Sequence, residues 1–172
     1  NSTNVDATKR LLKLAKNAGI KKFGFISSIA SLGRTKENNN YTESSPWSES
    51  TANSYYSKTK YQSEKMAIDA NSPEMPIYIV NPGVILGPCD WNKSSGTIFK
   101  TAIKGLKFYT KGVNGFVDVR DVAQGILKVM ENGIPSEKHI VVGENISYKD
   151  VFTKIARQTN SKLPTIYAPK WL

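Results

Sequence analysis

Two tyrosines in the segment NSYYSKTKYQSEK, residues 53–65, are each followed by a lysine four positions later. The pairs are Tyr56 with Lys60 and Tyr61 with Lys65. On an α-helix, residues four apart lie on the same face, with Cβ atoms roughly 5–6 Å apart. An ammonium group at that distance stabilises a phenolate, and a phenol tuned in this way can exchange a proton with a substrate oxygen. Either pair could therefore act as an acid–base couple.

The neighbours of the two pairs distinguish them. The face of Tyr56 and Lys60 continues to the small residues Ser63 and Ala67, which let a helix lie close against a sheet. The face of the second pair continues to Asp69 and is better suited to solvent. The first pair also lies nearer the start of the expected helix, beside a long polar loop where a substrate could enter. We therefore expect the chemistry at the first pair.

The elements that must position this pair alternate between helix and strand. Apolar residues at helical spacing, followed by Gly19, predict a helix over 5–19. Apolar runs near 22–28 and 77–82 predict buried strands, with the tyrosine helix between them at 52–71. We also expect a surface loop at 34–51, helices at 97–106, 119–133 and 147–160, strands at 106–110, 116–119 and 138–143, and a turn at 111–115.

This order is typical of βαβ units and a parallel sheet, so the sequence predicts an α/β fold. Only the two runs near 22–28 and 77–82 have the character of long buried strands. A free-standing doubly wound sheet usually needs more strands. We therefore expect polypeptide outside this chain to complete the sheet.

The composition limits the available chemistry. The chain of 172 residues has one cysteine, Cys89, and one histidine, His139, so we expect no disulfide, no metal site and no histidine-dependent triad. One cysteine fits a reducing, cytoplasmic location. The net charge of +10 comes from scattered lysines without interleaved aromatic residues, so we expect no nucleic-acid partner. No apolar run approaches the roughly 18 residues of a membrane helix, so no membrane partner is expected.

The segment YYSKTKYQSE resembles the Tyr-x-x-x-Lys segment of the extended short-chain dehydrogenase/reductases, the NAD(P)-dependent epimerase/dehydratase family. Four more segments resemble this family in the same order along the chain. They are NVDATKRLLKLAKNAGIKKFGFISSIASLG, IVNPGVILGP, GFVDVRDVAQGI and SYKDVFTKIA. Together they cover essentially the whole chain.

The resemblance implies the C-terminal part of a doubly wound parallel, Rossmann-like sheet with a small α/β substrate-binding subdomain. Residues 1–88 would form the second half of the dinucleotide-binding domain and carry the catalytic helix. Residues 89–172 would mainly form the substrate-binding subdomain, with 113–145 partly returning to the Rossmann sheet.

The resemblance also implies roles for individual residues. Tyr56 would be the general acid/base, and Lys60 would both tune it and bind the nicotinamide ribose. Ser28 would hold the substrate oxygen, with Ser27 as the alternative. Asn4 resembles a helix asparagine that organises water in related enzymes.

Besides Tyr56 and Lys60, four consecutive residues at the end of a buried strand are expected to contact the cofactor. A Pro-Gly turn there would present backbone groups to nicotinamide; its residues are Pro82, Gly83, Val84 and Ile85. The following loop, 89–96, would line the substrate pocket, with Trp91 as a wall and Ser95 near the cofactor. We expect Asp118, Arg120 and Asp121 to cap a helix and form ion pairs rather than bind substrate.

One feature of the family is missing from the sequence. The twelve glycines contain neither G-x-x-G-x-x-G nor G-x-G-x-x-G, the motifs that place a pyrophosphate at a helix N-terminus. We therefore expect a further N-terminal segment of the same protein to supply the phosphate loop. The isolated chain should be inactive, and the choice between NAD and NADP is unreadable.

These observations favour an NAD(P)-dependent oxidoreductase that uses Ser28, Tyr56 and Lys60. The first choice is an epimerase or dehydratase acting on a nucleotide-sugar. The alternative is a ketone or aldehyde reductase, resembling dihydroflavonol reductases, that acts on a small carbonyl compound. A non-catalytic NAD(P)-binding sensor is the alternative of another class. The small residues on the 52–71 helix resemble those of family dimers, so a homodimer is expected.

Overall fold

The computed structural model describes residues 3–33, 40–49 and 53–169. The chain forms two compact units. Unit 1 comprises Asn1–Pro82 and Val122–Val141, and unit 2 comprises Gly83–Asp121 and Val142–Leu172. The expected boundary between the dinucleotide-binding and substrate-binding parts at residue 88, with 113–145 partly returning to the Rossmann sheet, stays a prediction.

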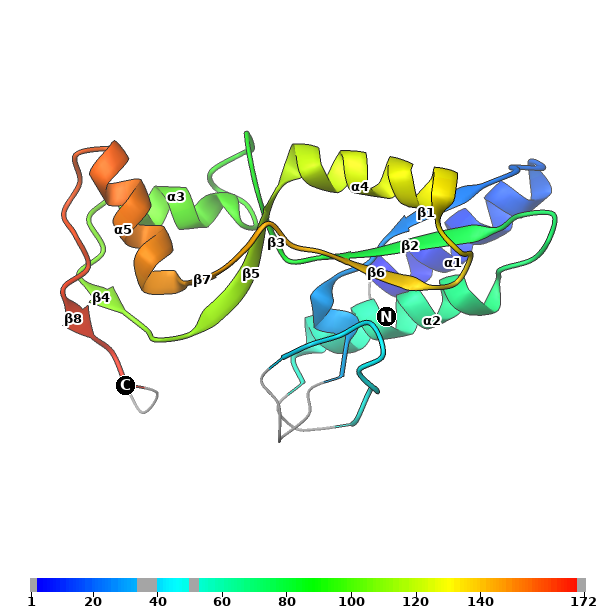
Figure 1. The fold of residues 1–172 in the computed structure, drawn as a ribbon, viewed down its shortest axis with the longest axis horizontal. Helices are drawn as coiled ribbons and strands as arrows, with labels where there is room; N and C mark the ends of the chain where they lie inside the picture. Colours follow the sequence, from blue (N-terminus) through cyan, green and yellow to red (C-terminus); the bar gives the residue numbers. More distant parts are fainter. Residues whose placement is uncertain (1–2, 34–39, 50–52, 170–172) are drawn as a thin grey trace. The chain divides into compact units, whose positions relative to one another are not determined.

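Unit 1 is built on a parallel sheet of three strands in the order β1-β2-β6. These strands are β1 (Phe23–Ile26), β2 (Ile77–Pro82) and β6 (Lys138–Val141). Every residue of β2 is buried, because β2 has a strand on each side and helices on both faces (Figure 1). The predicted parallel α/β fold and the three predicted strands of this unit are confirmed.

Three helices cover this sheet (Figure 1): α1 (Thr3–Asn17), α2 (Tyr55–Asp69) and α4 (Val119–Asn132). The residues of β1 show which face of the sheet each helix covers, because successive side chains of a strand point to opposite faces. Phe23 and Phe25 pack into the apolar core with Leu12 of α1 and Ala67 of α2. A Cβ on Gly24, between them, would lie 2.7 Å from Met130 Sδ of α4. Thus α1 and α2 share one face, and α4 covers the other.

Helix α2 begins directly after a capping serine. The Ser54 hydroxyl accepts a hydrogen bond from Ser57 N and caps the first turn. Its small-residue face, formed by Thr59, Ser63 and Ala67, is buried within unit 1. Because this face packs inside unit 1, its small residues do not support the expected homodimer.

The described residues of unit 2 form two small sheets and two helices. In the first sheet, β5 (Val113–Asp118) pairs in parallel with β3 (Val84–Leu86) and antiparallel with β7 (Glu144–Ser147). The second sheet pairs β4 (Phe108–Tyr109) with β8 (Ile166–Tyr167) in parallel. Helices α3 (Gly96–Ile103) and α5 (Tyr148–Gln158) pack together.

The structure corrects two turns. The predicted Pro-Gly turn is wrong, since the chain continues from β2 through Gly83 into β3. Gly83 is needed for another reason: a Cβ there would lie 2.3 Å from the carbonyl oxygen of Gly115 in β5. The predicted turn at 111–115 is also wrong over its last three residues, which belong to β5. Among the described residues, no helix is long and apolar enough to cross a bilayer.

Candidate active site

Lys60 lies on α2 and reaches the end of β1. Its Nζ donates a hydrogen bond to the Ile26 carbonyl oxygen at 3.0 Å and lies 5.6 Å from the centre of the Phe25 ring. Burial lowers the pKa of Lys60 below its ordinary value, and the nearby charge of Glu64 opposes that shift. The ammonium is therefore fixed beside the carboxyl end of a parallel strand, where open α/β sheets bind ligands.

Ser28 follows β1 by two residues and caps the short 3-10 helix η1 (Ile29–Ser31). Its hydroxyl oxygen accepts a hydrogen bond from Ala30 N at 3.2 Å, and within the described ranges its hydroxyl hydrogen has no acceptor. Ser27 differs, because its hydroxyl donates to Ser31 Oγ at 3.2 Å. The hydrogen bonds therefore favour Ser28 over Ser27 as the group that binds an oxygen.

Tyr56 occupies the first turn of α2, one turn before Lys60, and 53% of it is exposed. Among the described residues, its phenol oxygen has no hydrogen-bond partner, so it is open to a ligand. Its backbone is fixed: Thr59 Oγ1 donates to the Tyr56 carbonyl oxygen at 2.9 Å and accepts from Asn4 Nδ2 at 3.2 Å. Asn4 thus ties α1 to the first turn of α2 in this structure.

The second pair has a different environment. The Tyr61 ring stacks on the Trp47 ring, with centroids 4.3 Å apart and planes 6° from parallel. Lys65 is exposed. Tyr61 therefore packs on the loop before α2 instead of facing open solvent as expected, whereas Lys60 of the first pair contacts the end of β1.

The four expected cofactor residues are divided between the units. Pro82 ends β2 in unit 1, whereas Gly83, Val84 and Ile85 belong to unit 2. The Ile85 carbonyl oxygen accepts a hydrogen bond from Ser95 Oγ at 2.5 Å. Contact between these residues and nicotinamide stays a prediction.

Other polar and aromatic residues of unit 2 have local partners. Trp91 lies near Phe99, with ring centroids 6.2 Å apart. Asp118 forms an ion pair with Arg120 at 2.7 Å and accepts its backbone N–H, which confirms the expected capping and pairing. Hydrogen bonds from Arg120 lower the pKa of Asp118 to about 2.

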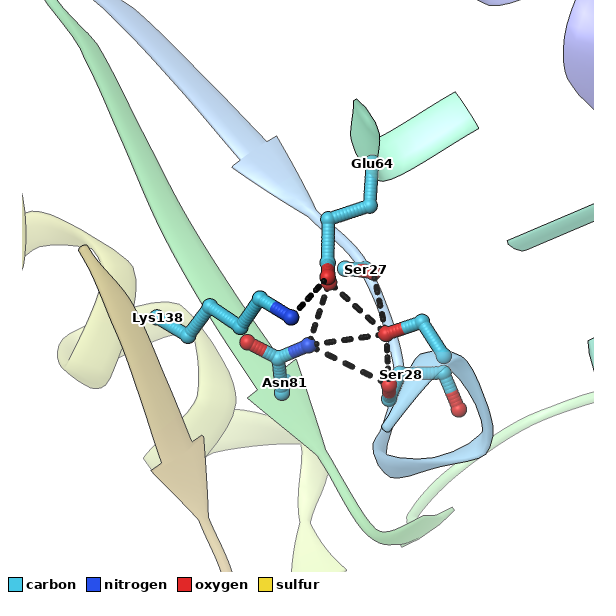
Figure 2. A network of polar contacts seen from close by, with 6 residues as sticks. Ser27, Ser28, Glu64, Asn81 and Lys138 are labelled. Carbon is cyan, nitrogen blue, oxygen red and sulfur yellow. Dashed lines mark hydrogen bonds and ion pairs between the residues drawn. The ribbon is translucent and has the colours of Figure 1, made fainter. Parts of the chain in front are cut away.

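A further residue of the site, which was not predicted from the sequence, is Glu64, four residues after Lys60 on α2. Its carboxylate is 1% exposed and contacts Ser31, Asn81 and Lys138 (Figure 2). The signal was present in the sequence, since Tyr56, Lys60 and Glu64 are spaced four apart on one helix face. A carboxylate among the small residues of a buried face needs a partner.

The donors fit one end of a nicotinamide dinucleotide. Lys60 has three N–H groups, and in the described structure one bonds to Ile26, which leaves two for ribose hydroxyls. The Tyr56 phenol and the Ser28 hydroxyl are two further donors on α2 and after β1, and their contact with a ribose or a substrate oxygen stays a prediction. The sequence contains no glycine-rich phosphate loop, so these residues fit only the nicotinamide-ribose end.

Comparisons with known proteins show the family to which the chain belongs. The model of the NAD dependent epimerase/dehydratase family matches residues 1–143. Sterol demethylase protein B of Methylococcus capsulatus is 29% identical over 96% of this chain and 51% of its own length. A putative dihydroflavonol 4-reductase of Synechocystis sp. is 28% identical over 99% of this chain and 51% of its own. The chain thus spans about half the length of the curated relatives it matches.

Solved structures share the fold. The crystal structure of gox2253 has a TM-score of 0.86 and 31% identity, over 95% of this chain and 51% of that chain. A dTDP-glucose 4,6-dehydratase from Bacillus anthracis, in complex with NAD, has a TM-score of 0.77 and 20% identity. This match covers 97% of the present chain and 56% of the dehydratase chain.

Proposed function

Because this chain belongs to the NAD dependent epimerase/dehydratase family, we propose that it is the C-terminal, proton-transferring part of an NAD(P)-dependent oxidoreductase. The reaction would interconvert a secondary alcohol and a ketone. The observation that carries this proposal is the placement of Lys60 at the end of β1, through its 3.0 Å hydrogen bond to Ile26. Tyr56 lies one turn before Lys60, and Ser28 lies two residues after Ile26.

Each residue has a separate part in the proposed reaction. The Tyr56 phenol gives a proton to the substrate oxygen during reduction and takes it back during oxidation. The Ser28 hydroxyl donates a hydrogen bond to the same oxygen. Lys60 holds positive charge beside the phenol and directs its remaining N–H groups to the cofactor ribose. When bound, NAD or NADP supplies the hydride chemistry.

The cofactor site requires polypeptide beyond these residues. Within the described part of the chain, β1 has a strand partner on one side only, and Ile26 on it is 46% exposed. On α1, Leu11 and Leu14 are 55% and 63% exposed. We propose that an N-terminal segment of the same protein adds strands beside β1, covers these side chains and provides the phosphate loop. We also propose a cytoplasmic location and a homodimer, whose interface would have to use a surface other than the buried face of Thr59, Ser63 and Ala67.

For the substrate, we favour an apolar ring compound that carries the alcohol or ketone. Both curated relatives reported above have names that refer to sterol or dihydroflavonol chemistry. Unit 2 offers a compatible cavity of about 250 Å³, whose lining is mainly apolar and aromatic. The lining residues are Leu106, Phe108, Tyr109, Thr110, Tyr148, Phe152 and Ala168.

A nucleotide-sugar is the second candidate, favoured by the family match over residues 1–143. A diphosphate needs unpaired cations. The more polar cavity of unit 2, about 570 Å³, includes Arg157 and Lys154, but Lys154 is paired with Glu144 at 3.1 Å. The dTDP-glucose dehydratase is only 20% identical to this chain, so its likeness shows the fold alone.

The experiment is a substrate survey with the whole protein that contains this chain. NAD(P)H oxidation would be measured with cyclic apolar ketones and, separately, with 4-keto nucleotide-sugars. We expect turnover with the ketones. Turnover with nucleotide-sugars alone would favour the second candidate, and tight NAD(P)H binding without turnover of either class would favour a sensor.

A further inference from the structure

The Glu64 carboxylate joins α2 to three other segments of unit 1 (Figure 2). Its Oε2 accepts hydrogen bonds from Ser31 Oγ at 2.7 Å and Asn81 Nδ2 at 2.5 Å. Its Oε1 pairs with Lys138 Nζ at 3.0 Å. Ser31 belongs to η1, Asn81 to β2 and Lys138 to β6. One buried charge therefore connects the helix of Tyr56 and Lys60 to all three strands or their extensions.

The same donors also hold the backbone of Ser28. Its carbonyl oxygen lies 2.7 Å from Ser31 Oγ and 3.2 Å from Asn81 Nδ2. Ser31 N donates to that carbonyl as well, at 3.0 Å. Two of the three groups that bind Glu64, Ser31 and Asn81, therefore also hold the backbone of Ser28, the residue expected to contact the substrate oxygen.

Hydrogen counting shows why the charge matters. Ser31 has one hydroxyl hydrogen and two acceptors at 2.7 Å, the Ser28 carbonyl and Glu64. Asn81 Nδ2 has two hydrogens and three acceptors, the third being Ser31 Oγ at 3.0 Å. When donors are scarce, an ionised acceptor takes the stronger bonds. The carboxylate therefore orients both donors.

In the part of the chain that the structure describes, the orientation of the Asn81 amide leaves its oxygen without a partner. Its Oδ1 is buried and, among the described residues, has no hydrogen-bond partner, because Nδ2 is turned toward Glu64. An unpaired buried carbonyl is unfavourable. The orientation is understandable if the bond to the carboxylate outweighs that loss.

We propose that Glu64 is a positioning residue, whose carboxylate holds residues 27–31 against α2 so that the Ser28 hydroxyl stays fixed relative to Tyr56 and Lys60. The catalytic consequence rests on the proposed function, whereas the structural consequence does not. A glutamine at 64 would bring an NH₂ group toward Lys138 or toward the donors Ser31 and Asn81. At least one donor would then face another donor, and the hold on Ser28 would loosen.

The test compares Glu64→Gln with wild type in the whole protein. Asp69→Asn is the matched control, since it removes an exposed carboxylate from the same helix. We expect kcat to fall about 10-fold to 100-fold in E64Q, as displaced reacting groups do, with KM for NAD(P)H changed by less than about twofold. Ser31→Ala keeps the Glu64–Lys138 ion pair and should also lower kcat. This second variant tests the proposal even if E64Q fails to fold.

Amide hydrogen exchange provides a readout that needs no activity. In E64Q, the amides of residues 30–32 should exchange about tenfold faster or more, while those of 77–80 in β2 keep their rates. Unchanged exchange at 30–32, or acceleration of both segments equally, would overturn the positioning role. Unchanged kcat in both E64Q and S31A would also overturn it. A wild-type protein without turnover would refute the proposed function, and the exchange rates would still decide the role of Glu64.

Discussion

Lys60 keeps a positive charge in a place that disfavours it. Burial lowers its pKa, and the Glu64 charge opposes the shift. Lys60 Nζ contacts the Ile26 carbonyl oxygen and the Phe25 ring, both of β1. A residue that is unfavourable for stability and well held in space is a typical functional residue.

Replacing Lys60 with methionine should separate function from stability. In wild type, the folded pKa lies below the unfolded one, so the unfolded chain binds more protons between those two values. The Lys60 contribution to the free energy of unfolding therefore rises with pH in that window. We expect the free energy of unfolding of K60M, relative to that of wild type, to be highest near neutral pH. The relative value should fall toward pH 10, which is about the ordinary lysine pKa.

Urea unfolding of K60M and wild type at both pH values measures this difference. Lys65→Met, at an exposed position of the same helix, is the control and should show little pH dependence. If the stability of K60M relative to wild type instead rose toward pH 10, the lowered pKa of Lys60 would be contradicted. Turnover of K60M should fall at all pH values.

At the scale of elements, the backbone just before β3 lies very close to the backbone of β5. A Cβ on Gly83 would lie 2.3 Å from the Gly115 carbonyl oxygen, a backbone atom that cannot move aside cheaply. We expect Gly83→Ala to destabilise unit 2 by about 1–3 kcal/mol, as overpacking does. Gly112→Ala is the matched control, because the nearest atoms to its Cβ lie 3.7 Å away.

Chemical denaturation of G83A and G112A would measure these costs. A G83A protein as stable as G112A would show that β3 and β5 do not approach as described. Loss of stability in both variants would instead point to a general intolerance of substitution in this sheet.

Sequence patterns predicted the elements of unit 1 better than those of unit 2. Long apolar runs and helical periodicity mark β2, α1 and α2, because each buries a continuous face. Strands β7 and β8 were missed, since ENIS and IY are short and lack alternation, and pairing with β5 and β4 defines them. The Pro-Gly pair suggested a turn, although the glycine serves strand packing.

The candidate site shows the same division. Spacing and chemistry were enough to select Tyr56 and Lys60, and the structure adds the hydrogen bond that fixes Lys60 to β1. Glu64 was missed because its partners Ser31, Asn81 and Lys138 are 33, 17 and 74 residues away along the chain. Contacts of that range depend on the tertiary fold.

At the scale of the whole molecule, the proposed cofactor site is shared by two parts of one protein. The isolated chain of 172 residues has the donors that we propose to bind the ribose, and its sequence has no glycine-rich phosphate loop. We expect it to bind NADH and NADPH at least about 100-fold more weakly than the whole protein, since the pyrophosphate would lack its helix N-terminus. Fluorescence titration of both proteins measures the ratio, and equal affinities would contradict the proposed division.

The central claim is that the Tyr56 phenol transfers the proton. The most direct measurement is single-turnover NAD(P)H oxidation by the whole protein carrying Tyr56→Phe, compared with wild type and with Tyr61→Phe as the matched control. We predict a loss of about 10²-fold to 10⁴-fold in Y56F, the usual contribution of a general acid, and a rate near wild type in Y61F. A Y56F rate equal to that of wild type would contradict the account.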